Sequence, residues 1–285
     1  MTGPTLSIVM PAHDEAAVIA RALEAITRDA SPGEFEIVVV ANGCTDDTVA
    51  RARSVDYPIT VLDIATPSKI AALNAGDEAA TAFPRLYIDA DIEIGSATVR
   101  ELADLLREES APLIAAPHLV VDASRSSWAV RAHYRIWDLS DYVRRGHVGS
   151  GVYALNRSGR ERFGTFPEVI ADDRYVQQLF AADERRNTAA STFTVRAPRT
   201  FSSLLKRSVR AAAGNRQLVD RGLAGDPAPA RGGPKALLKR VMGKPALWPS
   251  FAVYAVGYVV PRVMARRKLS SASALVWDRD ETSRV

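Results

Sequence analysis

The sequence contains very little cysteine and no histidine pattern typical of metal enzymes. Cys44 is the only cysteine among 285 residues, so an internal disulfide is impossible and a cytoplasmic setting is favoured. The histidines show neither HExxH nor another paired spacing; they are His13, His118, His133 and His147. We therefore expect neither a disulfide scaffold nor a zinc site.

Signal segments, long apolar runs and the usual nucleotide-binding loops are also missing. Residues 1–7 have no basic region followed by an apolar run, so no signal peptide is evident. The uncharged stretch at 245–261 has 17 residues, whereas a membrane-spanning helix needs about 20. Neither GxGxxG nor GxxxxGK[ST] occurs, which argues against a dinucleotide-binding fold and a P-loop.

The charge is unevenly distributed along the chain. Residues 1–195 carry 19 Lys and Arg against 28 Asp and Glu, a net charge of −9; residues 196–285 carry 18 against 5, a net charge of +13. A basic end on an acidic body indicates an anionic partner. Because the motifs of common nucleic-acid-binding domains are absent, we expect an anionic membrane surface as partner and no nucleic acid.

Strand and helix patterns alternate over the first ninety or so residues. Compact apolar runs predict strands at 6–10, 35–40, 59–64 and 86–90. Asp14 is expected to cap the first helix, Asp46 or Asp47 the second, and a third is expected over 69–80. This rhythm predicts an α/β fold, a mostly parallel central sheet with helices on both faces. Less regular elements follow: helices at 96–109, 127–144, 172–182 and 201–221, and strands at 112–121, 152–155 and 193–196.

Two carboxylates, Asp89 and Asp91, directly follow the apolar run at 86–88. In an open α/β sheet, ligands bind beyond the carboxyl ends of the strands. Two acids there provide hard oxygen ligands suited to Mg²⁺ or Mn²⁺ carrying a phosphorylated ligand. The alternative for this pair is a solvated turn.

Three further loops should meet at the same edge, namely 11–15, 41–48 and 68–76. Together with 89–91 they supply tight turns, several acids and one lysine, Lys69. This composition suits an activated, metal-bound phosphate ligand.

Read together, these loops resemble the family 2 glycosyltransferases, which have the GT-A fold. The family pattern runs P-A-x-N-E, V-D-D-G-S-T-D-x-T, G-K-x-x-A-L-N-x-G and D-A-D, and the chain follows its order and spacing over roughly the first hundred residues. A weaker likeness continues through 149–155, which resembles the acceptor-side loop. It reaches Asp172-Asp173, where the family usually carries Glu-Asp.

The resemblance implies an inverting enzyme that moves one sugar from a UDP- or GDP-linked donor to an acceptor hydroxyl, with Mn²⁺ or Mg²⁺ as cofactor. The acceptor would be a sugar, a lipid or a small molecule, in the synthesis of a cell-surface glycan, glycolipid or glycoside. The residues implied in donor binding are Pro11, Ala12, Glu15, Asn42, Lys69, Asp89 and Arg210. Asp91 would ligate the metal, with Asp89 beside it at the ribose; Asp173 would be the general base, with Asp172 next to it. The alternative for Asp172-Asp173 is an acidic helix N-terminus stabilised by the helix dipole.

Several positions depart from the family pattern. Asn42 replaces the aspartate that usually accepts a hydrogen bond from the nucleotide's base in the family, and Asp14 replaces an asparagine. The place of the late Q-x-x-R-W motif is taken by 207–214, without its glutamine and tryptophan, which favours transfer of a single sugar. Ile92 stands where many relatives carry a third acid, so we expect one ion.

We expect three segments in the chain. Residues 1–222 would form the GT-A body, with a nucleotide-sugar half (1–95) and an acceptor half (96–222). A linker would follow at 223–234, and then a basic and apolar segment at 235–285. The aromatic residues of 245–261 with their basic flanks indicate a cytoplasmic protein peripheral to the inner face of a membrane, the alternative being a helix packed on the body. No role is predicted for the tail at 277–284.

Two other functions remain open at the level of sequence. A nucleotidyltransferase would share the sheet and the metal acids, but the loop at 11–15 is neither glycine-rich nor basic. A degenerate GT-A domain could act as a membrane-surface interaction module. The joint presence of Asp89, Asp91 and Asp173 favours the enzyme.

Overall fold

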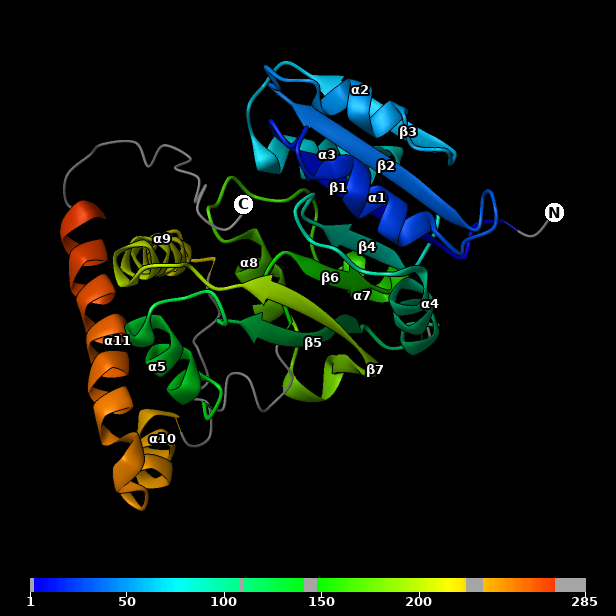
Figure 1. Cartoon of the computed structure of the whole chain (residues 1–285). Helices are drawn as coiled ribbons and strands as arrows, with labels where there is room; N and C mark the ends of the chain where they lie inside the picture. The colour runs from blue at the N-terminus through cyan, green and yellow to red at the C-terminus, as the bar shows by residue number, and fades with distance from the viewer. Residues whose placement is uncertain (1–2, 108–109, 141–147, 224–232, 270–285) are drawn as a thin grey trace. The chain divides into compact units, whose positions relative to one another are not determined.

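The computed structural model describes residues 3–107, 110–140, 148–223 and 233–269 (Figure 1). The elements, in chain order, are β1 (Leu6–Ala12), α1 (Ile19–Thr27), β2 (Phe35–Asn42), α2 (Thr48–Arg53), β3 (Ile59–Ile64), α3 (Lys69–Ala79), β4 (Arg85–Ile88), α4 (Ser96–Leu105), β5 (Ile114–Asp122), α5 (Trp128–Trp137), β6 (Val152–Leu155), α7 (Arg157–Arg160), α8 (Asp172–Gln178), the 3-10 turn η1 (Ala182–Glu184), β7 (Arg185–Arg196), α9 (Phe201–Asp220), α10 (Gly233–Met242), the 3-10 turn η2 (Pro245–Leu247) and α11 (Trp248–Leu269).

The chain divides into two compact units. The first comprises Met1–His118, Val148–Glu168 and Asp172–Phe193, and the second comprises Leu119–His147, Val169–Ala171 and Thr194–Val285. The domain boundaries expected from the sequence (1–222, 223–234 and 235–285) stay a prediction, and much of the expected linker lies outside the described residues.

The central sheet has seven strands in the order β3-β2-β1-β4-β6-β5-β7. The four strands β3, β2, β1 and β4 run parallel, with Ala12 opposite Ala41 and Val9 opposite Tyr87. β6 is antiparallel to both β4 and β5. The strand order reverses direction at β1, and in α/β proteins ligands bind beyond the carboxyl ends of the strands at such a point, here β1 and β4. The predicted α/β fold with a mostly parallel sheet is confirmed.

Helices cover both faces of the parallel strands because those strands are apolar on both faces. Val9 and Val40 point toward α3, whereas α1 buries Ile19, Leu23 and Ile26; Figure 1 shows α1 and α3 on opposite sides of β1 and β2. A Cβ at Gly76 would lie 2.5 Å from Val9 Cγ1, so glycine lets α3 approach the sheet closely. This packing fixes the amino end of α3, and Lys69 with it, against the sheet.

Some local expectations were wrong. Asp14 is not a helix cap: α1 begins only at Ile19, and Asp14 has a left-handed backbone with φ of 49°. Its Oδ1 instead accepts a hydrogen bond from the backbone N–H of Thr45 at 2.6 Å. β7 begins eight residues before the strand predicted at 193–196, because the exposed and half-buried side chains of its first part hide the strand period.

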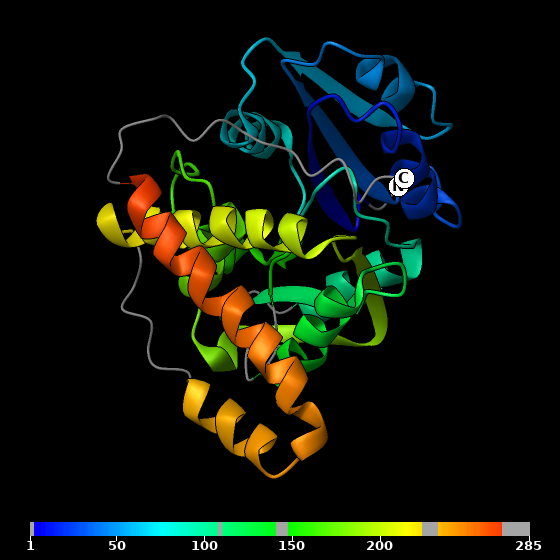
Figure 2. The same cartoon turned by 60° about the vertical axis from the view of Figure 1, so that its left-hand side comes forward.

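The second unit is built mainly from helices. α11 lies against α5 and α9 (Figures 1 and 2). Ile136 of α5, Leu237 and Val241 of α10, and Leu247 form an apolar cluster that includes the partly buried Phe251. Among the described residues, no helix is both long and apolar enough to cross a membrane. The tail at 277–284 lies outside the described residues.

Candidate active site

The first two parallel strands end in loops that are bonded to each other. β1 ends at Ala12 and β2 at Asn42, and the side-chain Nδ2 of Asn42 donates to the Ala12 carbonyl at 2.7 Å. His13 Nδ1 donates to the Asn42 carbonyl at 2.5 Å. The backbone N–H of Glu15 donates to Thr48 Oγ1 at 2.7 Å. These bonds fix the two loops that the sequence assigned to the nucleoside.

Pro11 and Ala12 are themselves buried strand residues of β1. Ala12 is only 2% exposed. Asn42 is also buried, with its amide oriented by Ala12. Pro11, Ala12 and Asn42 are therefore buried at the carboxyl ends of β1 and β2.

Lys69 joins the acids that follow β4 to those that open α8. It is the first residue of α3, whose N-cap Ser68 accepts from the backbone N–H of Ala71 at 3.1 Å. Its Nζ lies 2.7 Å from Asp89 Oδ1 and 3.2 Å from Asp172 Oδ1. Burial opposes its charge, but the carboxylates of Asp172 and Asp89 outweigh burial and hold the pKa of Lys69 above its usual value.

The acids at this edge outnumber the cations that balance them. Burial raises the pKa of Asp89 to about 6, the charge of Lys69 opposes this, and the carboxylates of Asp172 and Asp91 raise the pKa further. Burial likewise raises the pKa of Asp172. The charge of Lys69 lowers this pKa, and the carboxylate of Asp173 raises it. One lysine among four acids leaves an excess of negative charge, which is the electrostatic setting for a bound cation.

A loop with an unusual backbone separates Asp89 from Asp173. Gly149, Ser150 and Gly151 have φ values of 119°, 61° and 88°, three consecutive residues in the left-handed half of the map. Asp89 N–H donates to the Gly151 carbonyl at 2.8 Å, and Ser150 N–H donates to Asp173 Oδ2 at 2.9 Å. The loop therefore holds both acids by backbone bonds.

The two acids of α8 face different surroundings. Asp172 is 5% exposed and is paired with Lys69, whereas Asp173 is half-buried. Asp173 Oδ1 also accepts from the backbone N–H of Arg174 at 2.7 Å. Asp173 is thus the more accessible acid of the pair, the one that a ligand could reach.

Asp91 and Arg210 occupy exposed positions. Asp91 follows β4 two residues after Asp89 and raises the pKa of that carboxyl, so the two carboxylates are near one another. Arg210 lies on α9 in the second unit, and its contribution to donor binding stays a prediction.

Sequence reasoning missed Tyr153. This β6 residue is 2% exposed and stacks on Tyr87 with 5.1 Å between the ring centroids. Its buried hydroxyl has no hydrogen-bond partner among the described residues. Burial, followed by the carboxylates of Asp172 and Asp173, raises the pKa of Tyr153. Only the run of apolar residues at 152–155 marked this position in the sequence.

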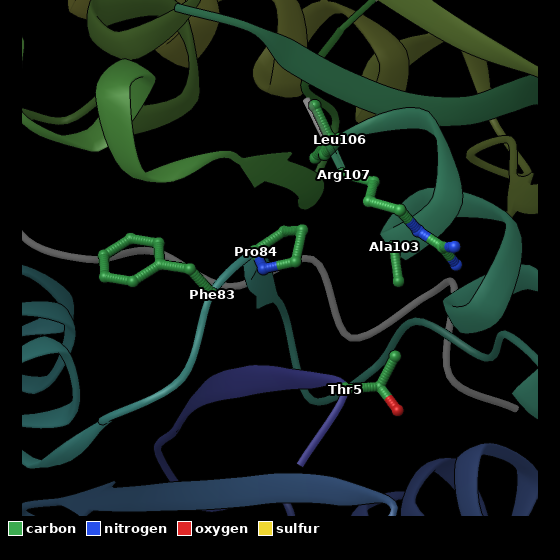
Figure 3. Close-up of a pocket in the computed structure, with 6 residues that line it drawn as sticks. All are labelled: Thr5, Phe83, Pro84, Ala103, Leu106 and Arg107. Atoms are coloured by element: carbon green, nitrogen blue, oxygen red, sulfur yellow. The ribbon is translucent and has the colours of Figure 1, made fainter. Parts of the chain in front are cut away.

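A cavity of about 150 Å³ lies elsewhere in the first unit (Figure 3). Thr5, just before β1, and Pro84, just before β4, line it together with Ala103 and Leu106 of the α4 region. These positions are at the amino ends of the parallel strands, the opposite edge from Lys69 and Asp89. Its lining lacks acids, and we assign it no role in the chemistry.

A family model matches more than half of the chain. The model of the glycosyl transferase family 2 matches residues 7–162. No curated protein sequence matches the chain.

Solved structures share the fold at low sequence identity. A mannosyltransferase from Pyrobaculum calidifontis, solved in complex with GDP-Man and Mn²⁺, matches with a TM-score of 0.60 and 19% identity over 95% of this chain and 79% of its own. The glucosyl-3-phosphoglycerate synthase from Mycobacterium tuberculosis, in complex with Mn²⁺ and UDP-glucose, matches with a TM-score of 0.56 and 20% identity over 79% of this chain and 81% of its own. Both matches support the predicted GT-A fold. Because the family model covers more than half of its length, the chain belongs to glycosyl transferase family 2 and is a glycosyltransferase.

Proposed function

We propose that the protein transfers a single sugar, with inversion at the anomeric carbon, from a nucleotide-diphosphate sugar to an acceptor hydroxyl. One observation carries the proposal: Lys69 bridges Asp89 and Asp172, and the loop at 149–151 holds Asp89 and Asp173 at the same edge. The acids that the family resemblance implies for donor and acceptor would thus lie at the same edge of the sheet. A degenerate domain would have no need to keep a buried lysine among these acids.

The donor would lie across the carboxyl ends of β1, β2 and β4. Ala12, Glu15 and Asn42 would contact the nucleoside, and the buried Nζ of Lys69 would stay charged near the diphosphate. The nucleotide of the donor would be UDP or GDP. The structural relatives are complexes with GDP-Man and with UDP-glucose. The amide of Asn42 donates to Ala12 and can present its oxygen to a base N–H of either nucleotide.

Asp91 and Asp89 fit a divalent ion of the Mn²⁺ or Mg²⁺ class. Such ions are commonly held by one or two carboxylates, the remaining positions being filled by phosphates and water. Asp89 Oδ1 is already engaged by Lys69, so Asp91, which is exposed, is the better ligand. When bound, the ion would neutralise charge on the departing diphosphate. Lys69 would add a second positive charge from the protein side.

Asp173 would accept the proton of the acceptor hydroxyl. Its carboxylate is fixed by the N–H groups of Ser150 and Arg174, and it is more accessible than Asp172. Asp172, which faces Lys69, would act as a positioning residue. General-base catalysis of this kind contributes about 10²–10⁴-fold in rate.

A sugar-nucleotide screen tests this function. We expect UDP- or GDP-sugars to raise the thermal midpoint in the presence of Mn²⁺, because a ligand of the native state stabilises it. Asp91→Ala should abolish metal-dependent hydrolysis of the donor. Asp173→Asn should keep donor binding but lower turnover by at least about 100-fold.

Asp104→Asn, at the exposed end of α4, is the matched control and should behave as wild type. If no sugar nucleotide shifts the midpoint with metal present, the proposed function is wrong.

We further propose that residues 1–222 act as the catalytic body and that 235–285 contact an anionic membrane surface. α11 exposes valines three and four residues apart, and Val259 is 54% exposed. Near its start Met242 is 56% and Trp248 50% exposed. The exposed basic residues of the same segment are Lys235, Lys239, Lys244 and Arg262. Apolar and basic side chains in this mixture suit the interface of an anionic bilayer.

Vesicle flotation tests the membrane assignment. We expect the full chain to float with phosphatidylglycerol vesicles at low salt, less so at high salt, and not with phosphatidylcholine alone. The double variant Met242→Ser/Trp248→Ser should lose flotation, and Val120→Ser, which alters an exposed valine of β5, should keep it. Equal flotation of both variants would remove the assignment.

A further inference from the structure

Three potential metal ligands of different chemistry meet between the first two strand ends. His13 and Asp14 directly follow β1, and Cys44 follows β2. Because Ala12 is opposite Ala41 in a parallel pair, the two loops leave the sheet side by side. One ligand atom from each residue lies within 4.8 Å of the other two. Among the described residues, no other group of three His, Cys, Asp or Glu side chains is gathered in this way.

The imidazole of His13 is oriented toward Asp14. Its Nδ1 donates to the Asn42 carbonyl at 2.5 Å, so the neutral ring carries its proton on Nδ1. Its Nε2 then has the lone pair and lies 3.9 Å from Asp14 Oδ2. A backbone carbonyl on the far nitrogen is the usual support of a metal-binding histidine.

The carboxylate of Asp14 is held with one oxygen directed toward His13. Its Oδ1 accepts from the N–H and the hydroxyl of Thr45 at 2.6 and 3.3 Å. Its backbone has a φ of 49°, a left-handed conformation that is unfavourable for a residue with a side chain. The hydrogen bonds to Thr45 offset this cost and fix where Oδ2 points.

Cys44 completes the group. Its Sγ lies 3.5 Å from the Ala12 carbonyl, which can accept the thiol proton, and the backbone N–H of Asp14 donates to it at 3.4 Å. The N–H donor remains in place when the sulfur is a thiolate. Cys44 is half-buried and its thiol is in no disulfide.

We propose that His13, Asp14 and Cys44 form a binding site for a borderline-soft divalent cation of the Zn²⁺ class, distinct from the Asp89–Asp91 pair. One imidazole nitrogen, one carboxylate oxygen and one thiolate sulfur suit Zn²⁺, and three protein ligands leave a fourth position for water. Mn²⁺ and Mg²⁺ prefer oxygen ligands and are disfavoured by the thiolate. On binding, three metal–ligand bonds form and the thiol proton leaves to solvent. Tetrahedral Zn²⁺ ligands lie roughly 3.3 to 3.7 Å apart, and the three ligand atoms here lie within 4.8 Å of one another, so the side chains need to close by at most about 1.5 Å.

The origin of the three ligands explains why no sequence motif marks this site. Metal motifs such as HExxH place their ligands on one helix, whereas here two ligands come from one loop and the third from another, about thirty residues later. The expectation that the chain lacks a zinc site depended on such spacings alone.

Occupancy of the site would oppose donor binding, a consequence that rests on the proposed function. Asn42 and Ala12, which would contact the nucleoside, are the residues whose carbonyls hold His13 and Cys44. An ion between the two loops would take space beside the nucleoside. We therefore expect Zn²⁺ to act as a competitive inhibitor with respect to the sugar nucleotide, even when Mn²⁺ is saturating.

Cobalt(II) absorption tests binding without reference to activity. We expect the reduced full-length protein to bind one Co²⁺ with a thiolate-to-metal charge-transfer band that Zn²⁺ abolishes and excess Mn²⁺ leaves unchanged. Cys44→Ser should lose the band and weaken Zn²⁺ binding at least tenfold by calorimetry, and His13→Gln should weaken it similarly. His118→Gln, an exposed histidine of β5, is the matched control and should bind as wild type. Equal Zn²⁺ affinity of wild type and Cys44→Ser would overturn the proposal, as would a cobalt spectrum without the thiolate band.

The two proposals fail in distinguishable ways. A normal cobalt spectrum together with no sugar-nucleotide binding would remove the enzyme function and leave the metal site intact. Donor binding that is normal and equally insensitive to Zn²⁺ in wild type and Cys44→Ser would remove the competition. We expect the donor KM to rise with Zn²⁺ at constant kcat in wild type, and to rise at least tenfold less in Cys44→Ser.

Discussion

Gly151 is hydrogen-bonded to Asp89 and leaves no room for a side chain beside its carboxylate. The backbone N–H of Asp89 donates to the Gly151 carbonyl at 2.8 Å, and a Cβ at Gly151 would lie only 2.8 Å from Asp89 Oδ2. Gly151 also has a φ of 88°, which other residues rarely adopt. Glycine at this position is therefore required by both the backbone and the carboxylate beside it.

Gly151→Ala should lower activity strongly at a modest cost in stability. The strained backbone should reduce the free energy of unfolding by about 1–3 kcal/mol. Displacement of Asp89 should reduce kcat/KM by at least about tenfold, since small errors in position are costly in catalysis. Gly164→Ala is the control, because Gly164 has no positive φ and a Cβ added there would meet no atom within 4 Å. Equal activity of the two variants would contradict the role of the loop.

Tyr153→Phe and Tyr87→Phe should change stability in opposite directions. The Tyr153 hydroxyl is buried without a partner among the described residues, so its removal should stabilise the protein by about 1 kcal/mol and keep the ring stack. The Tyr87 hydroxyl donates to Asp77 at 2.5 Å, so its removal should destabilise by about 1–3 kcal/mol. Urea denaturation of both variants measures the difference. A loss of stability in Tyr153→Phe would show that its hydroxyl has a partner.

Local patterns and motif order were sufficient to predict the parallel half of the fold. Runs such as 35–40 and 86–88 are apolar and short, and Asp89 lies just beyond the carboxyl end of β4, as expected. β6 was also recognised, but its antiparallel pairing with β4 was not, since pairing depends on contacts between residues far apart in the sequence. The eight residues missed in β7 have no clear period of two in their burial.

The candidate site was predictable as a set of residues but not as a set of contacts. Asp89, Lys69 and Asp172 were named from loops that the topology brings together, yet the bridge through Lys69 depends on the depth of α3 against the sheet. That depth is set by Gly76, whose missing side chain admits Val9 and Val40. The misassigned Asp14 has the same origin: its partner, Thr45, is on another loop.

Asp77 is expected to be the most costly carboxylate to neutralise outside the site. Its two oxygens accept from Arg85, Tyr87 and Arg160, with Arg85 Nη1 at 2.5 Å and Arg160 Nε at 3.0 Å. Burial opposes its charge, but the bonds from Arg160, Tyr87 and Arg85 outweigh burial and lower its pKa. Asp77→Asn would leave the two guanidinium groups without their counter-charge and should destabilise by about 3–5 kcal/mol.

The same carboxylate should contribute to acid denaturation. Its folded pKa is below its unfolded value of about 3.9, so its stabilisation is complete above that pH and is lost as the pH falls through the folded pKa. Urea denaturation at pH 7 and at about pH 3 should show a larger loss for wild type than for Asp77→Asn. Asp104→Asn removes an exposed pair with Arg107 and should change stability by less than about 1 kcal/mol at either pH.

His133 should make the helical unit sensitive to mild acid. The ring is 7% exposed, its Nδ1 has no hydrogen-bond partner among the described residues, and it packs against Tyr254 of α11 with 5.0 Å between centroids. Burial lowers the pKa of His133 to about 4. Between this pH and the unfolded value of about 6.5, the unfolded chain binds a proton that the folded chain does not. Stability should therefore fall as the pH drops from 6.5 to 4, by up to about 3 kcal/mol, and this contribution should be constant above 6.5.

Replacement of the ring isolates this effect from other titrating groups. His133→Phe keeps an aromatic ring beside Tyr254 and should flatten the dependence between pH 6.5 and 4, whereas His118→Gln, at an exposed position, should leave it unchanged. Gly257→Ala tests the packing around His133 separately from its titration. The added Cβ would lie 2.6 Å from His133 Nδ1 and should separate α11 from α5. We expect Gly257→Ala to destabilise by about 1–3 kcal/mol at pH 7 through overpacking. Identical slopes of unfolding free energy against pH in wild type and His133→Phe would show that His133 is protonated equally in both states.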